Sequence, residues 1–155
     1  MKRNIYSLSE KLDAKAQEPA VGYHSVDFMS PTTLLSVLNN TSSNNIKEDL
    51  EFIKNNTSSS DQTIADWLNV NVKTYRNYRE AGANLRPDIK EHLIILTALI
   101  KHGLAVFGSP EAFGSWLHTE NFQLAKLKPA ALLNTNSGVR LVDDRIAGIE
   151  FGDNA

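Results

Sequence analysis

The chain has 155 residues, of which 41% are hydrophobic and 22% are charged, and its formal net charge is -2. This size suits one compact domain or two small units that share a core. Because the chain contains no cysteine, disulfide frameworks, thiolate catalysis and cysteine-based zinc sites are all excluded. The near-neutral charge also argues against a generally basic coat for nucleic acid.

The sequence gives no sign of a membrane or export segment. The first residues include two basic side chains but no apolar run behind them, so we expect no signal peptide. The longest apolar run, at residues 93–100, is far shorter than the roughly 20 residues that span a bilayer. We therefore expect a cytoplasmic protein with no membrane partner.

Three helix signals precede residue 60. Residues 7–10 have the form of a capping box and open a weak amphipathic stretch. Residues 30–31, Ser-Pro, provide an N-cap and a first-turn proline for a second helix. Apolar residues recur at helical spacing over residues 46–53 and predict a third helix, which the polar stretch 55–60 is expected to end.

Residues 61–80 have the pattern of a helix-turn-helix. Asn69 falls where the turn requires a positive φ angle, which Asn tolerates better than most residues, and Val70 is expected to plug the turn. The inward faces of the two helices are predicted at Ile64, Ala65 and Leu68 and at Val72, Tyr75 and Tyr78.

The second helix of this unit presents a polar and basic face. Between residues 71 and 86 there are four basic side chains against one acidic side chain. Among the charged residues of the segment 46–68, by contrast, most are acidic. The segment resembles the Xre-type helix-turn-helix, in which the start of the second helix faces the major groove and a polar N-cap touches a phosphate. A merely solvated basic face is the ordinary alternative. The resemblance implies DNA contacts from Asn71, Lys73, Thr74, Arg76 and Asn77.

The longest predicted helix covers residues 88–107, begins after Pro87 and ends at Gly108. Its apolar residues leave little polar face, so it must be covered nearly all round. We expect part of that surface to meet a second copy of the chain. Further helices are predicted at 110–117, 129–133 and 137–149. Because no long segment alternates with period two, the predicted fold class is all-α.

The sequence contains no recognisable catalytic or metal-binding arrangement. His92 and His102 lie ten residues apart on one helix, almost three turns, and cannot share a metal ion, so ordinary hydrogen-bonded or exposed histidines are expected. Asp143 and Asp144 point roughly 100° apart on a helix and form no acid/base dyad. They indicate a solvated face or a partner-facing acidic patch. We expect no enzyme, no metal and no cofactor.

The last fifty residues carry five short motifs in a fixed order. They are Val106-Phe107-Gly108, Trp116-Leu117, Pro129 with Leu132-Leu133, Gly138 with Leu141-Val142-Asp143, and Ile146. In this order they resemble the C-terminal domain of the MbcA/ParS/Xre antitoxins. The resemblance covers residues 86–152 well. It departs in the loop 118–128, where Glu120-Asn121 and Ala125-Lys126 replace a Pro-Asn pair and a Gly-Gly pair of many relatives.

The resemblance implies the antitoxin of a two-gene toxin-antitoxin pair. In that reading residues 1–87 form an N-terminal helical region whose helix-turn-helix binds operator DNA of its own operon. Residues 88–155 form a C-terminal domain for toxin binding and dimerisation, which blocks a cognate RES-type toxin that depletes NAD. The NAD chemistry then belongs to the partner, and the expected assembly is a homodimer within a hetero-oligomeric complex.

The toxin contact is expected from the last helix and the tail. A short acidic tail that contains glycine and follows a rigid helix can enter a nucleotide cleft lined with basic groups. The expected contact residues are Val139, Arg140, Asp143, Asp144, Glu150, Phe151, Gly152 and Asp153.

Two other functions remain open from the sequence. One is a stand-alone dimeric helix-turn-helix transcriptional repressor, whose C-terminal domain only dimerises or senses a small molecule. The other, weaker one is a chromosome-partition or filament adaptor with the same C-terminal domain. An adjacent gene that encodes a small protein toxic by itself favours the antitoxin, and its absence favours the repressor.

Overall fold

The computed structural model describes residues 43–81 and 84–152 of the chain. The helix starts predicted at residues 7–10 and 30–31, and the predicted contact Asp153, lie outside the described residues. The described part is helical, and its single bridge between extended residues joins Asn121 and Leu127, so the predicted all-α class is confirmed. The elements are α2 (Ser43–Thr57), α3 (Asp61–Trp67), α4 (Val72–Ala81), α5 (Pro87–Phe107), α6 (Pro110–Leu117), η2 (Phe122–Leu124), η3 (Pro129–Leu132) and α7 (Asn136–Glu150).

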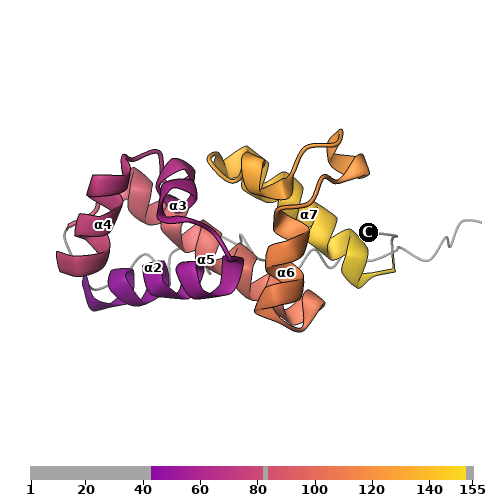
Figure 1. Ribbon diagram of the computed structural model, residues 1–155, viewed down its shortest axis with the longest axis horizontal. Coiled ribbons are helices and arrows are strands. Elements are labelled where there is room, and N and C mark those ends of the chain that lie inside the picture. The colour runs from indigo at the N-terminus through magenta and orange to yellow at the C-terminus, as the bar shows by residue number, and fades with distance from the viewer. Residues whose placement is uncertain (1–42, 82–83, 153–155) are drawn as a thin grey trace, which may run out of the picture.

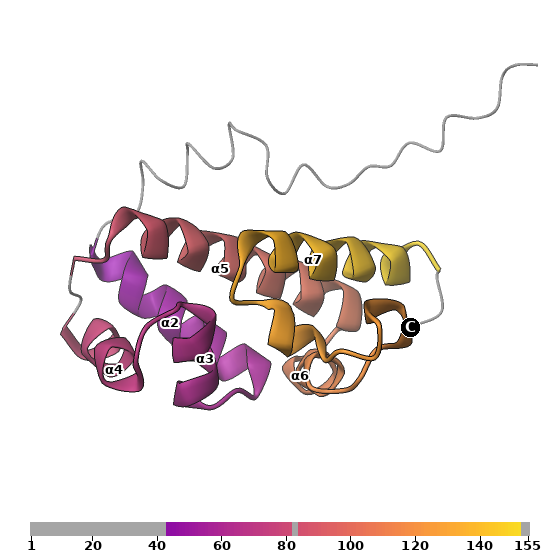
Figure 2. The same cartoon turned by 90° about the horizontal axis from the view of Figure 1, so that it is seen from above.

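The long helix α5 organises the molecule. Figure 1 shows α2, α3 and α4 gathered at one end of α5, and α6 and α7 at the other. Figure 2 shows α7 lying along the second half of α5, in agreement with the contacts between the two helices. Among the described helices none is by itself long and apolar enough to cross a membrane; α5 and α6 meet both conditions only together, and they are joined at a bend of 113°.

One apolar core runs through both ends of the molecule. Leu50 of α2, Tyr75 of α4, Leu96 of α5 and Val142 of α7 are all completely buried and belong to the same cluster. Since α5 contributes to this core along its length, the helices on either side of residue 87 are packed onto a shared element. The domain boundary at that residue stays a prediction.

Helices of the same chain cover most of the apolar surface of α5 that we expected a second copy to share. Helices α2, α6 and α7 of the same chain pack against α5. These helices leave few apolar side chains of α5 exposed. The large apolar side chains of α5 that are buried are Ile89, Leu93, Ile94, Ile95, Leu96, Leu99 and Ile100. Periodicity shows that a helix needs covering, but it does not show which chain covers it. A dimer stays a prediction and needs another surface.

Helix α2 extends into the polar stretch 55–60 that was expected to end it. Thr57 is completely buried, and its hydroxyl donates to the carbonyl oxygen four residues earlier at 2.8 Å. Asn56 donates in the same way to the carbonyl of Phe52 at 2.8 Å. Because these polar side chains bond to the helix's own backbone, they continue the helix, which ends before Ser58 with its φ of 53°.

Three glycines fix how the C-terminal helices meet. Gly108 ends α5 with a φ of 77°, as predicted. A Cβ atom at Gly138 would lie 1.9 Å from the carbonyl oxygen of Leu132, so α7 begins in contact with the backbone of η3. A Cβ atom at Gly103 would lie 2.2 Å from the ring of Phe113, so the small residue lets α6 approach α5.

Candidate functional site

The helices and the turn predicted at residues 61–80 are present. Asn69 has a φ of 53°, as the turn requires. The Val70 N–H donates to the carbonyl oxygen of Ala65 at 3.0 Å, and the half-buried Val70 side chain packs against the core. Helix α3 begins at the N-cap Ser60, whose hydroxyl accepts from the Thr63 N–H. The turn is thus fixed by local bonds and by packing.

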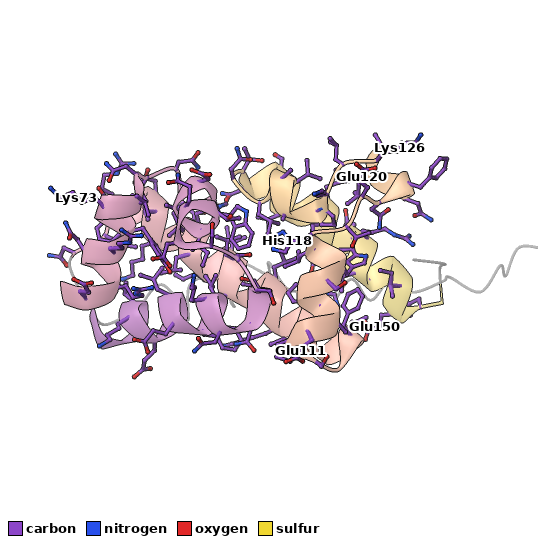
Figure 3. All side chains as sticks on the ribbon, in the orientation of Figure 1. Lys73, Glu111, His118, Glu120, Lys126 and Glu150 are labelled. Atoms are coloured by element: carbon purple, nitrogen blue, oxygen red, sulfur yellow. The ribbon has the colours of Figure 1, made fainter. Side chains whose placement is uncertain are left out.

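The residues predicted to contact DNA lie at the start and on the outer side of α4. The side-chain oxygen of Asn71 accepts the Thr74 N–H at 2.8 Å, so its role as the N-cap is confirmed. Lys73, Arg76 and Asn77 are exposed, and Thr74 is half-buried. Figure 3 places Lys73 and Glu150 at opposite ends of the molecule. The contact of these residues with DNA stays a prediction.

The basic face of α4 is partly neutralised from another helix. Asp61 of α3 pairs with Lys54 at 2.9 Å, with Arg76 at 3.2 Å and with Arg79 at 3.3 Å. The hydrogen bond from Lys54, together with the two guanidinium groups, lowers the pKa of Asp61 below its usual range. A count of charges along residues 71–86 misses this carboxylate, because it arrives from outside that segment.

At the other end of the molecule, α7 turns one face into the core. Thr135 caps the helix by accepting the Gly138 N–H at 3.0 Å. Val139, Val142 and Ile146 are completely buried. Val139 was expected to contact a toxin, and this expectation is wrong for its side chain, because it points into the core and has no surface to offer.

Two of the predicted acidic contacts are bonded to α5. Asp143 lies 2.6 Å from Nδ1 of His102, and Glu150 lies 3.4 Å from Nε2 of the same ring. The hydrogen bond to Asp143 raises the pKa of His102, with a smaller contribution from Glu150, while burial opposes the rise. The expected open acidic patch at 143–144 is therefore reduced to the exposed Asp144.

The three described histidines, His92, His102 and His118, are engaged in hydrogen bonds within the protein, as expected, while His24 lies outside the described residues. Nδ1 of His92 lies 2.6 Å from the side-chain oxygen of Asn136, and its Nε2 lies 2.8 Å from a backbone carbonyl. Nε2 of His118 lies 3.0 Å from the hydroxyl of Ser59. In residues 43–81 and 84–152 no group of three His, Asp or Glu side chains is placed to hold a metal ion.

The outer face of α7 carries exposed apolar side chains. Leu141 is 50% exposed and Phe151, which caps the helix, is 68% exposed. Their spacing places both on one side of the helix with the exposed Asp144, and Arg140 lies beside them. We call Arg140, Leu141, Asp144 and Phe151 the α7 outer face. Leu141 was not among the contact residues predicted from the sequence. Its position could have indicated exposure, because it does not fit the helical spacing of the buried residues Val139, Val142 and Ile146.

The loop 118–128 forms a second exposed feature. It contains η2, whose first residue Phe122 is 83% exposed. Ala125 and Lys126 have φ angles of 54° and 64°, a conformation that glycine adopts more readily than other residues. At these two positions the family resemblance led us to expect a Gly-Gly pair, and both residues have the backbone conformation that glycine would favour.

A hollow with a volume of ≈ 630 Å³ borders this loop. Trp116 and Phe122 both line it. The indole ring of Trp116 stacks with Phe113 at a centroid distance of 6.2 Å and packs against Phe107 at 5.1 Å. The wall is therefore continuous with the aromatic packing of α5 and α6.

In the described residues, large apolar side chains are exposed on α7 and in the loop 118–128, where they are available for contact with another macromolecule. A family model described as the antitoxin Xre/MbcA/ParS C-terminal toxin-binding domain matches residues 102–152. The chain therefore carries a toxin-binding domain of the Xre/MbcA/ParS type, and the resemblance seen in the five motifs is confirmed. A search of curated proteins gave no match to the chain.

The structure shows what these motifs do together. Gly108 stops α5, Pro129 begins η3, and Gly138 allows α7 to touch η3. Leu117 and Val142 fill the core between them. Most motif residues therefore fix the scaffold, and the exposed Leu141 is the motif residue that is free to contact a partner.

Proposed function

We propose that this protein is an antitoxin that binds and neutralises a RES-type, NAD-depleting toxin and represses its own operon through α3 and α4. The observation that carries the proposal is the match of residues 102–152 to a toxin-binding domain. The RES type and the NAD chemistry come from the resemblance to Xre antitoxins. Neutralisation needs no catalysis by this chain, because blocking access to the toxin's substrate site is sufficient.

We assign the toxin contact to the α7 outer face and the residues after it. Phe151 supplies an aromatic anchor, and Leu141 adds apolar area on the same side of the helix. Arg140 and Asp144 flank these side chains with opposite charges, which favours one orientation of a partner. Gly152, with a φ of 97°, lets the chain change direction after the helix.

We assign operator binding to the start of α4. In helix-turn-helix proteins the second helix lies in the major groove, and its first residues reach base edges and phosphates. Asn71, Lys73 and Asn77 are exposed at this position. A dimer would place two copies of α4 on half-sites about 34 Å apart. In support of separate roles, the two surfaces lie at opposite ends of α5 (Figure 1).

Co-expression tests the antitoxin function. Cells that express the toxin encoded beside this gene should stop growing and lose NAD, and wild-type antitoxin should restore both. Leu141→Ser combined with Phe151→Ser should fail to restore growth, since the exchange removes both apolar side chains from the interface. Lys73→Ala is the matched control and should restore growth fully, because Lys73 lies at the other end of the molecule.

The alternative repressor function gives a different result. An adjacent gene whose product has no effect on growth, together with wild-type DNA binding by this chain, would favour the stand-alone repressor. Rescue by the double variant at wild-type level would move the toxin contact away from the α7 outer face.

A further inference from the structure

Asp61, the first residue of α3, collects three basic side chains from two other helices. One carboxylate oxygen accepts from Lys54 of α2 at 2.9 Å and from Arg79 of α4 at 3.3 Å. The other oxygen accepts from Nε of Arg76 of α4 at 3.2 Å. The carboxylate therefore ties α2, α3 and α4 together at the edge of the basic face.

The three cations are not equivalent. Lys54 also donates to the backbone carbonyl of Ser59 at 3.0 Å. The guanidinium of Arg79 lies 5.7 Å from the centre of the Tyr75 ring. The side chain of Arg76, by contrast, is 55% exposed. Lys54 and Arg79 are thus held on the protein, while Arg76 is anchored by one edge and open to solvent on the other.

The bond to Arg76 uses Nε, and an arginine has four further N–H donors on its two Nη atoms. These are the donors that bind a phosphate in a forked arrangement. An arginine already held in one orientation loses less conformational entropy when it binds than a freely rotating one. The contact with Asp61 therefore prepares Arg76 for a phosphate.

The same carboxylate lowers the charge of the surface. Lys54, Arg76 and Arg79 bring three positive charges to this cluster. The negative charge of Asp61 reduces the net charge of the cluster to +2. Non-specific binding to DNA depends on the number of phosphates that a protein neutralises, so a smaller charge weakens it for every sequence. The lower charge weakens binding to every site, and the oriented Arg76 restores affinity where the docked protein meets a phosphate in the correct register.

We propose that Asp61 is a positioning residue for DNA discrimination, which orients Arg76 towards a backbone phosphate and limits binding to non-operator DNA. The inference rests on the proposed operator binding by α4. It predicts that loss of the carboxylate charge strengthens non-specific binding while it weakens the preference for the operator. A purely structural role predicts instead a lower thermal stability with an unchanged preference.

The test compares three variants of the full chain by fluorescence anisotropy. The probes are a duplex from the promoter of the protein's own gene and a scrambled duplex of equal length, each at several salt concentrations. Asp61→Asn keeps the shape of the side chain and removes its charge. Asp61→Glu restores the charge, and Lys54→Gln removes a partner of Asp61 that does not lie on α4. Circular dichroism establishes that each variant is folded at the temperature used.

Asp61→Asn should bind the scrambled duplex several-fold more tightly, with a slope of log K against log salt steeper by up to about 0.9. Its preference for the promoter duplex should fall by roughly 3- to 10-fold, because the oriented phosphate contact fixes the register in which the helix meets the base edges. Asp61→Glu should recover most of the preference, and Lys54→Gln should keep it.

An unchanged preference and an unchanged salt slope in Asp61→Asn would overturn the inference about Asp61. If the wild-type chain still prefers the promoter duplex in that experiment, the proposed operator binding stands. Equal loss of preference in Lys54→Gln would also overturn the inference, because any break in the cluster would then have the same effect. A wild-type chain that does not distinguish the two duplexes would overturn the operator-binding function together with the inference.

Discussion

The indole Nε1 of Trp67 donates a hydrogen bond to the carbonyl oxygen of Ala130 at 2.7 Å. Trp67 ends α3 and Ala130 lies in η3, so this buried bond joins the helix-turn-helix to the segment that leads into α7. Two residues after Trp67, Asn69 at the turn donates to the carbonyl oxygen of Asn134 at 2.8 Å. The proposed DNA-binding unit and the toxin-binding domain are therefore directly bonded to each other as well as packed onto α5.

Replacement of Trp67 by Phe should destabilise the protein by about 1–3 kcal/mol, because it leaves the buried carbonyl of Ala130 without its donor. Trp116→Phe is the matched control, since the buried Nε1 of Trp116 has no hydrogen-bond partner among residues 43–81 and 84–152 and its loss should cost less. Urea unfolding of both variants measures the difference. Equal costs would show that ring size, and not the hydrogen bond, determines the effect.

The His102 cluster should make stability depend on pH. Because Asp143 raises the pKa of His102 above its ordinary value of 6.5, the contribution of this contact is complete below that value. It is lost as the pH rises through the pKa of the folded state. Thermal unfolding should therefore show a larger decrease between about pH 6 and about pH 8.5 for the wild type than for Asp143→Asn. The exposed neighbour provides the control: Asp144→Asn should keep the wild-type pH dependence.

Gly138→Ala should prevent α7 from docking in its present position. The new Cβ would lie 1.9 Å from the carbonyl oxygen of Leu132, which is backbone and has little freedom to move. We expect a loss of about 3 kcal/mol or more, at the upper end of the usual effect of overpacking. Ser137→Ala, at the exposed neighbouring position, should change stability by less than about 0.5 kcal/mol. Chemical denaturation that finds similar values for both variants would contradict this close approach.

Glycine at position 125 or 126 should stabilise the protein. Ala125 and Lys126 have positive φ angles, and the removal of Cβ relieves a cost of about 1 kcal/mol per residue, partly offset by the entropy of the unfolded chain. We expect Ala125→Gly to raise the melting temperature. Ala131→Gly, within η3, should lower it. A lower melting temperature for Ala125→Gly would show that the methyl group makes contacts that outweigh the backbone conformation.

Removal of the residues after Glu150 should separate folding from neutralisation. Glu150 is the last residue of α7 and contacts His102, so a chain that ends there keeps this contact and its core. It should fold normally and bind DNA, yet fail to protect cells from the toxin because Phe151 is gone. A chain that ends at Ile149 should in addition lose part of the stability at acidic pH. Full protection by the chain that ends at Glu150 would exclude the tail from inhibition.

Features that depend on a few neighbouring residues could be predicted from the amino-acid sequence. The positive φ at Asn69, the N-cap at Asn71 and the end of α5 at Gly108 follow from local backbone preferences, and all three are present. The five motifs of the C-terminal domain were also readable, because their residues fix local turns and helix starts. Helix periodicity likewise predicted the inward face of α4, where Tyr75 is completely buried.

Which distant groups meet depends on how the helices pack against one another. This packing brought Asp61 to Arg76 across 15 positions and Asp143 to His102 across 41. It also covered α5 with helices of the same chain, buried Val139 and left Leu141 exposed. Such pairings depend on how whole helices cross and on the total apolar area that packing buries, and no spacing along the chain contains that information.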